Sequence, residues 1–238
     1  MVGMAGIASL RFGIVPALLF GGGLILAYQI YLGYRERKQP GYAIHGLNAL
    51  ARIRWVASVM ADGRKDVLAV QTLRNSLMAA SMMASTAILL VIGTLNLGSE
   101  GARLEELLRP ISNRAHDAAG DHALIVLLLL ADFFVAFFFF SMAIRYFNHV
   151  GYMVNLPQGH DALFSSHRVA AYLNRAGRFY SLGTRAFHMC VPLVFGLFGP
   201  VYLLVASVGL VIALFLMDRP PPTEIPARSV ESEPRIER

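Results

Sequence analysis

The sequence predicts an all-α integral membrane protein, a bundle of four transmembrane helices with amphipathic interfacial helices in its connections. Hydrophobic residues make up 56% of the 238 residues and charged residues only 15%, whereas a soluble domain carries about a quarter charged residues. The missing charge is concentrated in four long uncharged segments. The net charge of +6 lies beside these segments and not in one compact basic domain, so we expect membrane topology, not nucleic acid, to explain it.

Four segments are expected to cross the membrane, because about 20 apolar helical residues span a hydrocarbon core of about 30 Å. They are residues 12–34, 76–97, 123–146 and 187–217. The last is too long for one straight crossing, and Pro192 with the pair Gly199-Pro200 is expected to kink or divide it. Residues 1–217 therefore form one membrane domain. The proline-rich tail, residues 218–238, has no apolar face to bury and is predicted to be disordered.

The charges of the connections predict the orientation. The first connection has seven basic residues and the third has four, whereas the three of the second are outnumbered by acids. Short basic loops stay on the cytoplasmic side, so the first and third connections should be cytoplasmic and both termini should face the other side. Residues 44–60 and 166–183 are predicted to be interfacial helices in these two connections.

Polar side chains are expected to gather at the cytoplasmic helix ends. At helical spacing, residues from four segments reach the same depth, and the residues predicted to bind a ligand are Arg52, Gln71, Arg74, Asn75, Arg145, Asn148 and Arg185. Possible additional members are His45, Asn48, Trp55, Tyr152 and Asn155. The acids at this level are too few to neutralise the arginines, so a lipid headgroup or a small anion could complete the cluster. Alternatively, these side chains only cap helix ends, reach to headgroups and set topology.

Asp132 is the charged residue within the apolar stretch 123–144 of the third predicted span, and it lies far from this cluster. It could relay a proton or a cation, or it could stay neutral and hydrogen-bonded between helices. His149 and His188 lack the spacing of a haem or metal site, and no cofactor or metal is expected. No phosphate loop, catalytic triad or carboxylate pair is present, so the chain is not expected to be an enzyme.

Several short motifs resemble a known family. They are Asn48 to Arg52 with Trp55, the run LAVQTLRNS at residues 68–76, Arg145 with Asn148, Asn155 with Pro157, Arg185 with Phe187 and Pro192, and Phe198-Gly199-Pro200. Together they resemble the membrane family catalogued as domain of unknown function 599, which occurs in bacteria and plants. The resemblance covers about residues 28–217. It implies the multi-pass architecture, and it implies no activity. We expect the protein to lie in a bacterial inner membrane.

The leading hypothesis is therefore a non-enzymatic membrane protein that binds an anionic lipid headgroup or a small anion at its cytoplasmic helix ends. An oligomeric channel or transporter is one alternative. A structural or assembly subunit of a larger membrane complex is another. The expected partners are membrane lipids and either further copies of the chain or another membrane protein.

Overall fold

The computed structural model describes residues 13–38, 44–99, 118–156 and 164–219. This part of the chain is helical and contains no strand, which confirms the all-α class. Its helices are α1 (Ile14–Lys38), α2 (Ile44–Ala61), the short 3₁₀ helix η1 (Gly63–Lys65), α3 (Asp66–Ser99), α5 (Ala118–Met153), α6 (Ser166–Gly196) and α7 (Pro200–Met217). By length and composition, α1, α3, α5 and α7 can each cross a membrane, so the multi-pass prediction is confirmed.

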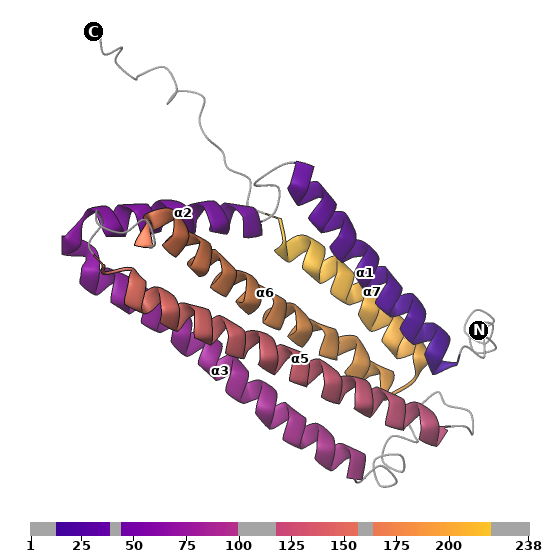
Figure 1. Cartoon of the computed structure of the whole chain (residues 1–238). Helices are drawn as coiled ribbons and strands as arrows, with labels where there is room; N and C mark the ends of the chain where they lie inside the picture. The colour runs from indigo at the N-terminus through magenta and orange to yellow at the C-terminus, as the bar shows by residue number, and fades with distance from the viewer. Residues whose placement is uncertain (1–12, 39–43, 100–117, 157–163, 220–238) are drawn as a thin grey trace.

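The long helices form a bundle in which α6 lies between α3 and α5 on one side and α1 and α7 on the other (Figure 1). α3 and α5 run antiparallel, with Val91 packed near Leu129 at one end and Leu73 near Phe147 at the other. α6 runs antiparallel along α5 for its full length, from the Tyr146–Tyr172 ring contact to the packing of Gly196 near Ile125. α7 and α1 pack together on the other side of α6, and α2 crosses the start of α6.

α6 differs from the prediction. An interfacial helix at residues 166–183 and a span at 187–217 were expected, but one 31-residue helix includes the first and continues into the second. Pro192 lies inside α6 without ending it. The break comes at Gly199, whose φ of 138° lies in the left-handed region that favours glycine, and Pro200 begins α7 at a helix start, where proline is tolerated.

The extra helix changes the topology. α1 and α7 are parallel, because Ile14 and Leu203 pack together near their starts whereas Tyr28 hydrogen-bonds Asp218 after the last turn of α7. The first and last described residues, Gly13 and Arg219, therefore lie at opposite ends of the bundle (Figure 1). The prediction placed both termini on the same side, whereas in the described chain α6 adds a fifth passage along the bundle, between α5 and α7.

The tail prediction also needs a correction at its first residue. Asp218 caps the end of α7 and is 7% exposed, so it belongs to the folded bundle. Its backbone oxygen accepts a hydrogen bond from the Ile44 N–H at the start of α2, at 3.2 Å. The predicted disorder of residues 220–238 lies outside the described residues, as does most of the second connection.

Small residues allow the long helices to approach closely, as expected for membrane helices. Ala80 and Ala84, one turn apart on α3, are both buried. On α1, a Cβ added at Gly21 would lie 2.5 Å from the Ser207 Oγ of α7, whereas one added at Gly22 or Gly23 would meet nothing within 4 Å. Of these three glycines, Gly21 is therefore the one that lies against another helix.

Candidate functional site

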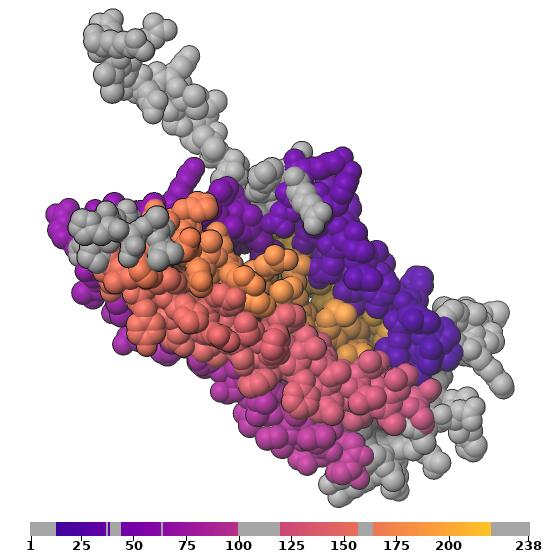
Figure 2. All heavy atoms as spheres, in the orientation of Figure 1, coloured from indigo at the N-terminus to yellow at the C-terminus, as the bar shows by residue number. Residues whose placement is uncertain are grey.

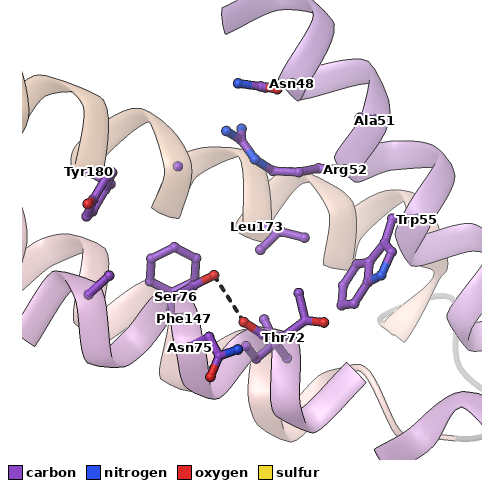
Figure 3. A pocket seen from close by; sticks show the side chains of 13 residues that line it. Asn48, Ala51, Arg52, Trp55, Thr72, Asn75, Ser76, Phe147, Leu173 and Tyr180 are labelled. Carbon is purple, nitrogen blue, oxygen red and sulfur yellow. Dashed lines mark hydrogen bonds between the residues drawn. The ribbon is translucent and has the colours of Figure 1, made fainter. Parts of the chain in front are cut away.

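A groove of about 630 Å³ lies where α2 crosses the long helices (Figure 3). Its residues come from four helices: Asn48, Ala51, Arg52 and Trp55 of α2, Thr72, Leu73, Asn75, Ser76 and Ala79 of α3, Phe147 of α5, and Leu173, Gly177 and Tyr180 of α6. None of these lining residues is acidic. Arg52 is the charged group among them, so the groove carries a positive charge.

The local sequence places α2 over the groove. Val56 and Val59 are buried against α3, α5 and α6, which turns the opposite side of α2, with Leu50 and Ile53, outward. At its end, Asp62 caps η1 by accepting a hydrogen bond from the Arg64 backbone N–H at 3.2 Å. The Asn48, Arg52 and Trp55 stripe follows at intervals of four and three residues, which brings all three side chains to the groove.

Arg52 is seated closely on α6. Its Nη1 donates a hydrogen bond to Asn174 Oδ1 at 3.2 Å. The guanidinium also lies over Gly177, where an added Cβ would come within 2.5 Å of Cζ. Burial lowers the pKa of Arg52, yet an arginine stays charged at neutral pH. The guanidinium therefore bears a burial cost that an anion in the groove would offset.

The other polar side chains of the groove differ in whether their hydrogen-bond donors are already used. Thr72 Oγ1 and Ser76 Oγ each donate to a backbone oxygen one turn earlier, at 2.9 and 3.1 Å, so their protons are already used. The Asn48 and Asn75 amides line the groove from opposite sides (Figure 3). The donors that line the groove and could bond an incoming anion are therefore the Arg52 guanidinium, these two amides, the Trp55 indole N–H and the Tyr180 hydroxyl.

A second polar cluster surrounds Asp218 at the same end of the bundle. Its Oδ2 accepts a hydrogen bond from the Tyr28 hydroxyl at 2.9 Å, and its Oδ1 lies 3.4 Å from both His45 Nε2 and Arg185 Nη2. Arg185 also donates to the Gln29 side chain. Burial alone would raise the pKa of Asp218, but the His45 hydrogen bond, the Arg185 charge and the Tyr28 hydrogen bond together lower it.

The family comparison agrees with the motifs that the sequence shows. The family model described as "Protein of unknown function, DUF599" matches residues 16–222. The chain belongs to the DUF599 family. The match extends beyond residues 28–217, where the resemblance was placed from motifs. Neither a curated protein nor a solved structure matches the chain.

In this DUF599 protein, the predicted cluster is divided. Arg52, Asn75, Asn48 and Trp55 line the groove. Arg185 and His45 lie instead in the Asp218 cluster, and a carboxylate of the same chain already partners Arg185. The remaining members of the predicted cluster are exposed: Gln71, Arg74, Arg145, Asn148, Tyr152 and Asn155. Asp132 lies in another cavity, between α1, α5, α6 and α7.

Sequence reasoning missed three residues that shape these sites. Asp218 was assigned to the tail because prolines follow it, and its pairing with α1, α2 and α6 needs the folded bundle. Asn174 and Gly177 lie on α6, three residues apart and therefore on one helical face. A glycine within a polar helical stretch was the available signal, since close approach is one reason for glycine there.

We predict that Gly177→Ala displaces the Arg52 guanidinium, because the new methyl group would occupy its place. The exchange should weaken the binding of an anionic ligand in the groove at least tenfold, as measured by native mass spectrometry. Gly151→Ala on α5 is the matched control, since its Cβ would meet nothing within 4 Å. That control should leave binding unchanged and stabilise the helix by about 1 kcal/mol. Equal binding by the two variants would show that anion binding does not require the Arg52 guanidinium to lie over Gly177.

Proposed function

We propose that this DUF599 protein is a non-enzymatic membrane protein that binds the anionic phosphate headgroup of a lipid-like molecule in the groove between α2 and α3. The observation that carries this proposal is Arg52, a half-buried guanidinium in a groove with no acidic residue among its described lining residues. Arginine binds phosphate oxygens through parallel charge-assisted hydrogen bonds. The Asn48 and Asn75 amides would then orient the headgroup.

The composition of the groove favours an amphiphile over a free ion. Beyond its few polar groups, it is lined by apolar and aromatic side chains, including Trp55, Leu73 and Phe147. A tryptophan at this position suits the headgroup level of a bilayer. The groove also extends along α3 to Ala79, within the uncharged run that begins at Leu77. A headgroup on Arg52 would therefore direct its acyl chain toward the hydrocarbon core.

The groove would face the cytoplasm of a bacterium, in its inner membrane. Support comes from the basic residues at this end of the bundle, which include Arg54, Arg64 and Lys65 near α2 and Arg168 and Arg175 near the start of α6. Such a charge excess is typical of the cytoplasmic side. The start of α1 would lie on the other side, and the end of α7 would be cytoplasmic. Fusion of a cytoplasm-active reporter after Arg219 tests this orientation.

Arg52→Gln tests the binding proposal. Glutamine keeps a polar side chain but removes the charge, and loss of a charge-assisted hydrogen bond of about 1.5–3 kcal/mol corresponds to a ten- to hundredfold loss of affinity. Native mass spectrometry of the purified protein should show phosphatidylglycerol retained by the unmodified chain in preference to phosphatidylcholine. The variant should lose that preference.

Arg54→Gln is the matched control, because Arg54 lies on the same helix and is exposed. It should retain the lipid preference. Two further probes separate a headgroup from a free ion: dihexanoyl phosphatidic acid should displace the bound lipid, and inorganic phosphate at the same concentration should not. Retention of phosphatidylglycerol by Arg52→Gln at the level of Arg54→Gln would refute the proposal, and displacement by phosphate alone would assign the groove to a small anion.

A further inference from the structure

A second cavity, of about 240 Å³, lies on the side of α6 away from α3. α1 and α5 form opposite walls, and α6 and α7 complete it. Figure 2 shows the surface hollowed between α1 and α5, with atoms of α7 visible at the bottom of the gap. The polar lining residues are Asp132 of α5 and Ser207 of α7, and the others are glycine, proline or apolar residues.

The Asp132 carboxyl group is incompletely bonded within the described part of the chain. Its Oδ2 atom is buried and has no hydrogen-bond partner there. A buried polar atom without a partner is costly, and more so at the depth of a membrane. The Asp132 Oδ2 atom therefore lacks a hydrogen-bond donor among the described residues.

Ser207 does not supply that donor. Its hydroxyl proton is already donated to the Leu203 backbone oxygen at 2.8 Å, so the Ser207 oxygen can only accept a further bond. Pro192, which also lines the cavity, has no N–H to bond the His188 carbonyl one turn earlier. The polar groups around the cavity therefore accept hydrogen bonds, and a complementary ligand must donate them.

The charge of Asp132 and the apolar lining of the cavity restrict the kind of ligand further. In the part of the chain that the structure describes, no lysine or arginine lines the cavity, so the charge of an ionised Asp132 has no opposite partner among these lining residues. An ammonium group supplies both a positive charge and several N–H donors. The surrounding side chains, such as Leu18, Ile25 and Leu203, suit an apolar body. The small volume limits that body to a short alkyl chain or a single ring.

We propose that this cavity binds a small amphiphilic ammonium ion, with its charged group on Asp132 and its apolar body between α1, α5 and α7. The gap between α1 and α5 gives such a molecule a path from the membrane. This site is separate from the Arg52 groove in position and has the opposite charge, so either proposal can fail without the other.

Benzylamine, which is protonated at neutral pH, is the probe. It should raise the thermal midpoint of the purified protein in a saturable manner, and benzyl alcohol, which has the same ring without the charge, should not. Asp132→Asn should weaken the apparent affinity for benzylamine at least tenfold. Asp121→Asn, on the same helix but outside the cavity, should leave it unchanged.

A second measurement does not depend on how the variant folds. Without a bound cation, the buried Asp132 carboxyl group favours its protonated form, and a hydrophobic carbodiimide, which adds as an intact molecule to a protonated carboxyl group, should label it. A bound ammonium ion favours the ionised carboxylate, so benzylamine should protect Asp132 from the label. The proposal is overturned if benzylamine neither stabilises the protein nor protects Asp132. It is equally overturned if benzyl alcohol acts as well as the amine, or if Asp132→Asn binds benzylamine unchanged.

Discussion

Asp218→Asn is expected to lower the free energy of unfolding by about 3 kcal/mol, the loss typical of a buried ion pair that is deprived of one partner. The carboxylate joins three helices through Tyr28, His45 and Arg185. Asparagine keeps the size but removes the charge, so Arg185 would be left half-buried with only Gln29. Titration of the purified protein with dodecyl sulfate in mixed micelles measures the change.

A double-mutant cycle with Arg185→Gln tests whether the loss comes from the pair. Because the two side chains share one interaction, the combined variant should be less destabilised than the sum of the single variants. Strict additivity would show that Asp218 acts through its other contacts. Arg64→Gln serves as the control, since the Arg64–Asp62 pair is largely exposed and should contribute little.

The same carboxylate predicts a pH dependence. The pKa of Asp218 is lowered in the folded protein, so its contribution is fully present above the ordinary aspartate value of about 3.9. It is lost as the pH falls through the lower folded value. The stability difference between the unmodified protein and Asp218→Asn should therefore shrink as the pH falls below about 4. A difference that did not shrink below that pH would contradict the pairing.

Phe140→Ala is expected to lower the free energy of unfolding by about 3 kcal/mol, because truncation of the buried ring leaves a cavity. Phe140 is 0% exposed and its ring lies 5.6 Å from both the Tyr180 and Phe187 rings. It also covers Gly183, where an added Cβ would come within 2.8 Å of the ring. Truncation would therefore open the centre of the α5–α6 interface.

Phe138→Ala is the matched control from the same run of phenylalanines. Phe138 is 58% exposed on the outer face of α5, so its truncation should cost less than about 1 kcal/mol. Comparison of the two variants by dodecyl sulfate titration tests which face of α5 packs against the other helices. Equal losses at the two positions would mean that this face of α5 is covered, for example by another copy of the chain.

The helices that could be predicted from the sequence are those whose own residues show a clear local pattern, either a long uncharged run or helical spacing of polar residues. Uncharged runs located the cores of α1, α3 and α5, and spacing located α2, including the side of it that carries Asn48, Arg52 and Trp55. α6 was divided wrongly because Arg168, Arg175, Arg178 and Arg185 gave its first half the composition of an interfacial helix. Its helical continuation to Gly196 depends on packing along α5, which no local pattern records.

The candidate site was predicted in part, for the same reason. Spacing showed that Arg52 and Asn75 each share a face with other polar residues, but not which face meets another helix. Arg145 and Asn148 lie on a comparable stripe of α5 and proved exposed, because that helix turns Phe147 and Val150 inward. The partner of Arg185 was missed since Asp218 is 33 residues away along the chain and comes near only when α7 folds back along α6.

We propose that Arg52 receives its counter-charge from a bound anion and not from this chain. Electron cryomicroscopy of the full-length protein in phosphatidylglycerol nanodiscs tests it most directly. We expect headgroup density within hydrogen-bond distance of the Arg52 guanidinium and beside Asn75, with acyl density continuing past Leu73. An empty groove, or a carboxylate from any part of the chain bonded to Arg52, would contradict it.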